Sequence, residues 1–257
     1  MKVALLAGGF GTRLSEETTI KPKPMVEIGG RPIMWHIMKF YAHQGIRDFV
    51  VLGGYKVELI RDYFLHYRAR HCDFSIDLQS GTVEWSDSLA DDWRVTVLDT
   101  GTDSMTGGRL RRARHLLQDD TFFLTYGDGL SDLNLQELLR THRDAGAWCT
   151  LTAVTQPGRY GALRLEEGGS RVLSFREKGP GDEGLINGGF FACEPEILDL
   201  IENDQTVLEE SPMSSLVAKG KLASHRHHGF WQCMDSLRDR MVLEEHWLTN
   251  PPWKIWD

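Results

Sequence analysis

Paired cysteines, long apolar runs and an excess of positive charge are all missing from this sequence. The four cysteines lie far apart, at positions 72, 149, 193 and 233, without the spacing of a zinc site or the density of a disulfide framework. No apolar run reaches the roughly 18 residues of a membrane helix, and Met1 leads into a strand pattern rather than a signal peptide. We therefore expect reduced thiols and a cytoplasmic location.

Positive charge is too scarce for a surface that neutralises a nucleic-acid backbone, because the formal net charge is −8. We predict small-molecule substrates, with neither nucleic acid nor membrane as a partner. Any anionic ligand must then be bound by a local basic pocket. The length of 257 residues with 41% hydrophobic composition suits one domain with a core of ordinary size.

Strand and helix patterns alternate through the first half of the chain. Strands are predicted over residues 2–7, 48–52, 95–98 and 122–125, and helices over 32–44, 56–70, 108–117 and 133–142. This order predicts an α/β fold with a Rossmann-like, mostly parallel mixed sheet flanked by helices on both faces. Such sheets bind ligands beyond the carboxyl ends of their strands.

The second half has short strand patterns separated by glycine-rich turns. They cover residues 150–154, 162–165, 172–175 and 186–192, with helices expected over 212–220 and 236–248. No composition shift marks a linker, although residues 80–92 are polar enough for a surface excursion. We predict one domain over residues 1–257, in which the part after about residue 130 completes the same sheet and adds a substrate-facing subregion.

A glycine-rich loop follows the first strand directly. Its residues are Leu6, Ala7, Gly8, Gly9, Phe10, Gly11, Thr12 and Arg13. The glycines bring backbone N–H groups close to a phosphate or base, although a glycine loop alone is equally compatible with a mere turn. The loop is not a Walker A loop, because no Gly-Lys-Ser/Thr ends it, and it is not a dinucleotide fingerprint, because Leu14 stands where the third glycine should be.

Fixed cations follow this loop in the segment Lys21-Pro-Lys23-Pro. The alternating prolines stiffen the backbone and fix the direction of the lysine side chains. A solvated basic turn is the alternative for this segment alone. Together with Arg13, the segment favours a triphosphate site.

Two aspartates are candidate ligands of a metal ion. Asp128 follows the strand over residues 122–125 within Tyr126-Gly-Asp-Gly, and Asp235 precedes a predicted helix. A β-turn aspartate and a helix N-cap are the structural alternatives. Mg²⁺ needs only one or two protein carboxylates beside water and substrate phosphates, so these two suffice.

Other polar residues are weaker candidates. Glu177, Lys178, Asn187 and Gly188 could hold a sugar phosphate and its hydroxyls. We interpret His225, His227 and His228 as a solvated strand end and Trp231 as a core residue. The run from Arg109 to Arg114 reads as a helix with one charged face, although Arg109 could point into a cleft.

Five motifs stand here in the order found in sugar-1-phosphate nucleotidyltransferases, which the sequence therefore resembles. They are the loop from Leu6 to Leu14, Lys21-Pro-Lys-Pro-Met25, Tyr126-Gly-Asp128, Glu177-Lys178 and Asn187-Gly-Gly189. Within that superfamily, Ser15-Glu-Glu-Thr18, Asp103-Ser-Met-Thr-Gly-Gly-Arg109 and Gly229-Phe-Trp-Gln232 are similar to the glucose-1-phosphate cytidylyltransferases. Two positions depart from the family pattern: Gly179 separates Lys178 from Pro180, and Ser236 replaces the usual threonine.

The resemblance implies a fold of the nucleotide-diphospho-sugar transferase type and a transfer of the cytidylyl group of CTP to glucose 1-phosphate. It places the loop to Arg13, with Lys23, Ser104, Arg109 and Gly127, around the nucleotide. Asp128 and Asp235 would hold Mg²⁺, and Glu177, Lys178, Asn187 and Gly188 would face the sugar phosphate. Relatives form homo-oligomers, for which the Trp-rich stretch 247–256 is a candidate contact surface. A thymidylyl or uridylyl transferase and a non-catalytic nucleotide-sugar sensor remain the alternatives.

Overall fold

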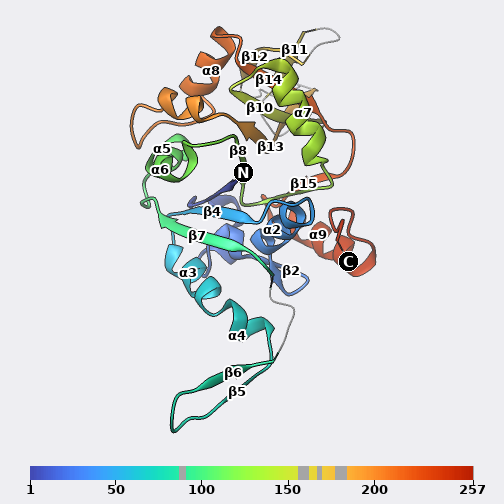
Figure 1. Cartoon of the computed structure of the whole chain (residues 1–257). Helices are drawn as coiled ribbons and strands as arrows, with labels where there is room; N and C mark the ends of the chain where they lie inside the picture. Colours follow the sequence, from blue (N-terminus) through green and yellow to red (C-terminus); the bar gives the residue numbers. More distant parts are fainter. Residues whose placement is uncertain (87–90, 156–161, 167–169, 177–183, 257) are drawn as a thin grey trace.

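The computed structural model describes residues 1–86, 91–155, 162–166, 170–176 and 184–256, in which nine strands form a central sheet (Figure 1). Its main path runs β12-β11-β13-β8-β1-β4-β7, and β10 joins β13 to β14. The strands are β1 (Val3–Ala7), β4 (Asp48–Gly53), β7 (Arg94–Asp99), β8 (Phe122–Tyr126), β10 (Cys149–Thr155), β11 (Ala162–Leu165), β12 (Val172–Arg176), β13 (Leu185–Cys193) and β14 (Leu222–Arg226).

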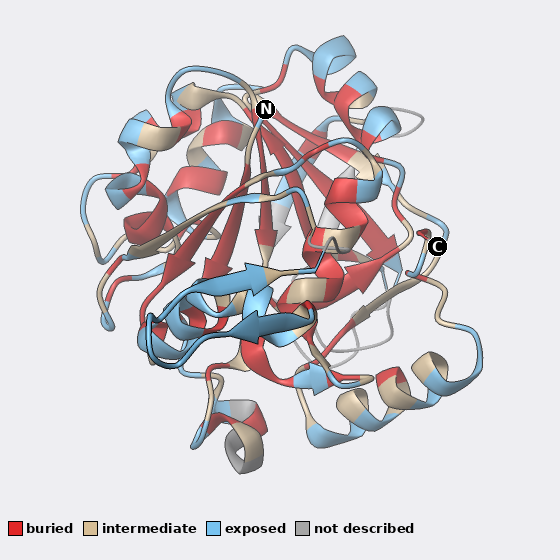
Figure 2. Ribbon diagram, turned by 60° about the horizontal axis from the view of Figure 1, so that its bottom comes forward, coloured by how far each residue is buried: buried red, intermediate tan, exposed pale blue. Residues whose placement is uncertain are grey.

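The parallel part of the sheet consists of β8, β1, β4 and β7. Alternate side chains of β1 enter different cores: Val3 and Leu5 join the cluster that contains α2 (Ile33–His43), and Ala4 and Leu6 join the cluster on the opposite face. Because both faces are covered, every residue of β1 is buried (Figure 2). This explains why the strand reads as a continuous apolar run.

The sheet becomes antiparallel at β13, which pairs with β8 and β11 along one side and with β10 along the other. β10 in turn forms a second parallel pair with β14. Helices α7 (Leu135–Ala145) and α8 (Ser211–Ala218) contact this part of the sheet. The predicted fold class, a mixed sheet with helices on both faces, is confirmed. β13 also carries Asn187 and Gly188 beside the end of β8.

Several predicted helices are interrupted. The helix expected over residues 56–70 consists of α3 (Val57–Leu65) and α4 (Tyr67–His71), and the one expected over 108–117 consists of α5 (Thr106–Arg112) and α6 (Arg114–Leu117). The glycine-rich loop and the residues that follow it, up to Met25, contain three short helical turns: η1 (Thr12–Leu14), α1 (Ser15–Thr18) and η2 (Lys23–Met25). Neither interruption of a predicted helix has a glycine or proline to announce it.

A hairpin of β5 (Phe74–Ile76) and β6 (Val83–Trp85) projects from the body of the molecule (Figure 1). Four of its apolar side chains are exposed, those of Phe74, Ile76, Leu78 and Val83. The predicted excursion over residues 80–92 falls partly on this hairpin, and residues 87–90 lie outside the described part of the chain. Among the described helices, we find none with both the length and the apolar character of a membrane span.

The C-terminal helix α9 (Leu237–Thr249) packs near the loop that carries Lys23. Arg240 donates to Glu17 at 2.5 Å, and Glu244 accepts the backbone N–H of Gly29 at 3.0 Å. Beyond the helix, Trp253 is fully buried and Trp256 is nearly so. The prediction of a tryptophan contact surface is therefore wrong for these two residues, because they pack against their own chain around His36.

Candidate active site

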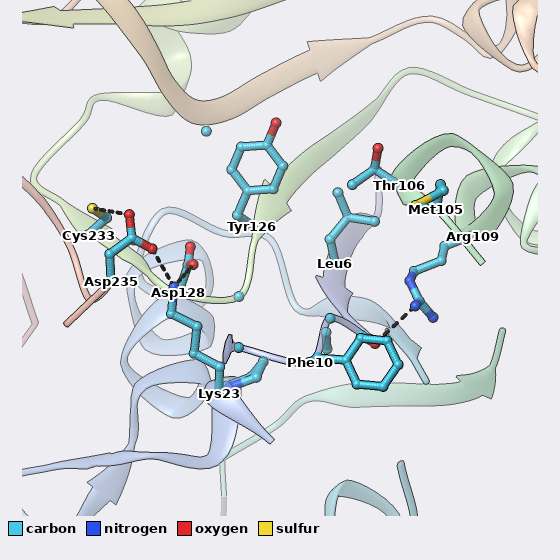
Figure 3. A pocket seen from close by; sticks show the side chains of 18 of the residues that line it. Leu6, Phe10, Lys23, Met105, Thr106, Arg109, Tyr126, Asp128, Cys233 and Asp235 are labelled. Atoms are coloured by element: carbon cyan, nitrogen blue, oxygen red, sulfur yellow. Dashed lines mark hydrogen bonds and ion pairs between the residues drawn. The ribbon is translucent and has the colours of Figure 1, made fainter. Parts of the chain in front are cut away.

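A cavity of about 680 Å³ opens at the carboxyl ends of β1 and β8 (Figure 3). The glycine loop lies on one side of it, and Asn187, Gly188 and Asp235 lie on another. This position agrees with the rule that open parallel sheets bind ligands beyond their carboxyl ends. Segments more than 200 residues apart in the sequence, such as those of Lys23 and Asp235, meet in this cavity.

Lys23, Asp128 and Asp235 form an ionic cluster at one end of the cavity (Figure 3). The Lys23 Nζ lies 2.6 Å from Asp128 Oδ2 and 2.6 Å from Asp235 Oδ1. Burial by itself lowers the pKa of Lys23, but attraction to both carboxylates outweighs it and raises that pKa above its ordinary value. The lysine is therefore a fixed positive charge that draws two carboxylates to one point.

Local structure explains how these three side chains converge. Pro22 precedes η2 and Pro24 lies within it, so the backbone beside Lys23 is stiff. Asp128 lies in the two-residue turn between β8 and β9 (Gly129–Ser131). Ser236, and not Asp235, is the N-cap of α9, in a capping box with Asp239, so the N-cap alternative for Asp235 is wrong. The carboxylate of Asp235 is thereby left for the cavity.

Arg109 lies at the other end of the cavity and is 4% exposed. Its guanidinium donates to the carbonyl oxygens of Gly8 at 2.9 Å, Gly53 at 3.1 Å and Gly101 at 2.7 Å. These acceptors follow or end β1, β4 and β7, so one side chain ties together three neighbouring strand ends. Burial lowers the pKa of Arg109 from its ordinary value, though an arginine remains protonated.

The predicted nucleotide loop lines the cavity from Leu6 to Thr12. A Cβ atom at Gly8 would lie 2.1 Å from Arg109 Nη1, so this glycine is required by the close approach of the guanidinium. Phe10 is 48% exposed, and its ring lies 5.4 Å from that of Tyr55. Arg13 is carried by η1, and the description of this residue stops at its backbone.

The remaining predicted residues fall into two groups. Ser104, Gly127, Asn187 and Gly188 line the cavity together with the residues already described. Glu177 and Lys178 lie outside the described residues. The structure therefore brings together every described candidate except Arg13, whose side chain it leaves out.

Sequence reasoning set aside Trp231, which also lines the cavity and donates its indole N–H to the Gly188 carbonyl at 2.6 Å. It also predicted a solvated cluster of histidines, whereas His227 is mostly buried and pairs with Asp132 at 2.9 Å. Both differences arise from β15 (Trp231–Cys233), which pairs with β9 (Gly129–Ser131) next to Asp128. Strands of three residues have too short a pattern to be recognised in a sequence.

Thr106, Tyr126 and Gln205 also line the cavity but were not predicted as site residues. Tyr126 stands two residues before Asp128, so its place beside that carboxylate was the only available signal. Thr106 lies at the start of a helix, within the motif from Asp103 to Arg109 that gave the family resemblance, but that motif was read for Ser104 and Arg109 only. Gln205 lies in a distant loop and belongs to no motif.

The cavity combines a glycine-rich loop with a cluster of one lysine and two carboxylates, and comparisons with known proteins define the class of the protein. Residues 2–236 match the family model described as Nucleotidyl transferase. Because the match spans most of the chain, the chain belongs to the nucleotidyl transferase family.

Several relatives match over the whole length of both chains. Glucose-1-phosphate cytidylyltransferase of Salmonella typhi is 48% identical over 259 residues, with 100% of each chain covered. The probable glucose-1-phosphate cytidylyltransferase of Bacillus subtilis (strain 168) is 40% identical over 258 residues, again with 100% of each covered. The resemblance seen in the motifs is therefore confirmed.

A solved structure confirms the fold. The crystal structure of HddC from Yersinia pseudotuberculosis superposes with a TM-score of 0.77 over 96% of this chain and 99% of that chain. The two sequences are 22% identical, so this likeness concerns the fold. It agrees with the predicted nucleotide-diphospho-sugar transferase type.

Proposed function

We propose that this chain transfers the cytidylyl group of CTP to α-D-glucose 1-phosphate, giving CDP-glucose and pyrophosphate. The observation that carries the proposal is the convergence of Lys23, Asp128 and Asp235 at one end of a cavity whose other wall is the glycine loop. The base and sugar are taken from the printed names of two full-length relatives.

The proposal divides the chain into two working halves within one domain. In residues 1–130, approximately, the loop from Leu6 to Arg13, with Lys23, Ser104, Arg109 and Gly127, would bind CTP. In the second half, Asn187 and Gly188 would bind glucose 1-phosphate together with Glu177 and Lys178. The lining of the cavity supports the described part of this assignment.

Mg²⁺ belongs to the proposal as the cofactor, held by Asp128 and Asp235. The fit is supported by the two carboxylates, which approach the same ammonium group at 2.6 Å and so can approach the same cation. Two carboxylate oxygens with water and phosphate oxygens are a typical magnesium ligand set. When bound, Mg²⁺ would neutralise charge on the phosphates of the nucleotide.

The residues of the chain would act by alignment rather than by forming a covalent intermediate. An oxygen of the sugar phosphate attacks the α-phosphorus of CTP, a new P–O bond forms, and the bond to the departing pyrophosphate breaks. Lys23 would neutralise charge at the reacting phosphates, Arg13 would stabilise pyrophosphate, and backbone N–H groups of the loop would hold the triphosphate.

The test is pyrophosphate release with Mg²⁺ and glucose 1-phosphate against CTP, UTP, dTTP, ATP and GTP, each also without the sugar phosphate. Release that requires both CTP and glucose 1-phosphate is the expected result. Release with UTP or dTTP would keep the reaction and overturn the base assignment in favour of a uridylyl or thymidylyl transferase. Nucleotide binding without release from any pair would favour the non-catalytic sensor.

Assembly and location complete the proposal. A homo-oligomer is expected, and because Trp253 and Trp256 are buried, the exposed apolar side chains of the β5–β6 hairpin are the surface to change first. Light scattering of the purified protein tests the assembly. A cytoplasmic location is consistent with four cysteines that form no disulfide in the described structure.

A further inference from the structure

Glu209 joins two walls of the cavity through hydroxyl groups. Its Oε1 accepts the Tyr126 phenol at 2.5 Å, and its Oε2 accepts the Thr106 hydroxyl at 2.6 Å. Thr106 begins α5 on the side of Arg109, whereas Tyr126 ends β8 on the side of Asp128 (Figure 3). Both hydroxyl-bearing residues line the cavity, and Glu209 is not among the described residues that do.

The direction of each hydrogen bond follows from the chemistry of the groups. An ionised carboxylate can only accept, so the Tyr126 and Thr106 hydroxyls must both donate their protons to Glu209. Asn187 Nδ2 lies 3.4 Å from the Tyr126 oxygen, and Asn187 Oδ1 accepts the Gly189 N–H at 2.8 Å. The Asn187 amide is therefore oriented with its NH₂ group towards the phenol, which accepts from it.

The position of the Tyr126 ring is closely determined. A Cβ atom at Gly189 would lie 2.4 Å from Tyr126 Cδ2, and Gly189 has a φ of +77°, so only glycine suits this contact. Burial, and then the charge of Glu209, raise the pKa of the Tyr126 phenol well above its ordinary value. The phenol therefore keeps its proton and donates it in the hydrogen bond to Glu209.

We propose that Glu209 is a positioning residue for the sugar phosphate: by accepting the Tyr126 proton, it leaves the phenol oxygen to face the ligand purely as an acceptor for a sugar hydroxyl. This inference rests on the proposed function, because it assumes a sugar phosphate beside Asn187. The side chain introduced by Glu209→Gln has one acceptor oxygen and one NH₂ group, so it cannot satisfy both hydroxyls in the same way.

The experiment measures KM for each substrate in the purified full-length protein for Glu209→Gln, Tyr126→Phe, the double variant and Thr106→Val. For Glu209→Gln and Tyr126→Phe we expect KM for the sugar phosphate to rise about tenfold, the effect of one hydrogen bond, with KM for the nucleotide within about twofold. The double variant should resemble Tyr126→Phe alone, because Glu209 acts through that phenol. Thr106→Val is the matched control, since it removes the other hydroxyl from Glu209.

Three results would overturn the inference: equal effects on both substrates, additive effects in the double variant, or the same sugar-phosphate effect in Thr106→Val. Monodeoxy analogues of the sugar phosphate test the wild-type protein in case a variant does not fold. One analogue should have a KM about tenfold higher, again the effect of one hydrogen bond, and equal KM values across the series would contradict the inference. If the wild type uses another substrate pair, the proposed function fails, and the same comparison is made with that pair.

Discussion

The two ends of the cavity each contain a cation, but the two cations have opposite kinds of partner. Lys23 is held by the carboxylates of Asp128 and Asp235, whereas Arg109 is held by backbone carbonyls of three strand ends. A carboxylate carries a net negative charge, which favours a divalent cation in place of the ammonium group, whereas a backbone carbonyl is neutral and offers only a dipole. We therefore expect the Lys23 end to take part in the reaction and the Arg109 end to maintain the shape of the cavity.

Removing a carboxylate tests the chemical end most severely. We expect Asp128→Asn to lower kcat roughly a thousandfold or more, because the amide loses the charge that a metal ion needs. Pyrophosphate release measures the change. Asp62→Asn, which alters an exposed ion-paired carboxylate on α3, is the matched control and should leave kcat unchanged. Near-normal turnover of the Asp128→Asn variant would contradict the proposal that Asp128 holds Mg²⁺.

The next largest effect is expected when the cation at position 23 keeps its charge but changes its shape. Lys23→Arg keeps the charge but replaces a compact ammonium with a planar fork that cannot take the same position between two carboxylates. We expect kcat to fall about a hundredfold, since a misplacement of about 1 Å has this cost, with a thermal midpoint close to that of the wild type. Lys21→Arg, in the half-exposed pair with Glu27, provides the comparison. If both variants were equally active, Lys23 would have no special place.

The structural end should respond in stability first. Arg109→Lys leaves buried carbonyls without donors, and we expect the free energy of unfolding to fall by about 3 kcal/mol, measured by urea titration. KM for CTP should rise because the loop loses its anchor. Arg111→Lys, on the exposed face of the same helix, should change neither quantity. If the Arg109→Lys variant were as stable as the wild type and only its kcat fell, Arg109 would act in the reaction as Lys23 does, and the proposed difference between the two ends would be wrong.

His36 is a buried base without a carboxylate partner among the described residues, and the loss of solvent therefore dominates its pKa. Burial lowers its pKa to about 4, so the unfolded state binds the proton first as the pH falls below 6.5. Stability is therefore full above pH 6.5 and is lost towards pH 4. Between about pH 7 and about pH 5 this histidine should contribute a loss of about 2 kcal/mol to the free energy of unfolding. His36→Gln should reduce that loss, whereas a change of the exposed His115 to Gln should leave it intact.

The two ends also differ in how far the sequence could predict them. Lys23 stands between prolines and Asp128 follows an apolar strand, so local rules and family motifs both pointed to them. Apart from the Thr100 hydroxyl, the partners of Arg109 are backbone carbonyls, which any residue type could supply, and they come from three distant segments. Glu209 carries no local motif, because its partners Thr106 and Tyr126 are brought to it by the fold alone.

The parallel strands β1, β4 and β8 were predicted well because each is a mostly apolar run that is almost entirely buried. β7 is only half-buried, and its central residues Val95, Val97 and Leu98 were enough to predict it. The three-residue strands β9 and β15 were not predicted, and with them Trp231 was left out of the site. The departure at Ser236 is explained by its N-cap role, which serine fills as well as threonine does. The departure at Gly179 lies outside the described residues.

The ionic cluster joins residues from the beginning and the end of the chain, since Lys23 meets Asp235. A ribosome synthesises a chain starting from its N-terminus, at about 5–20 residues per second. Lys23 is therefore made long before Asp235, the second carboxylate of the cluster. During synthesis the glycine loop and Asp128 can fold together, but the complete cluster must wait for Asp235. A nascent chain stalled before this residue would therefore lack the full cluster, so the site forms late in the synthesis of this domain.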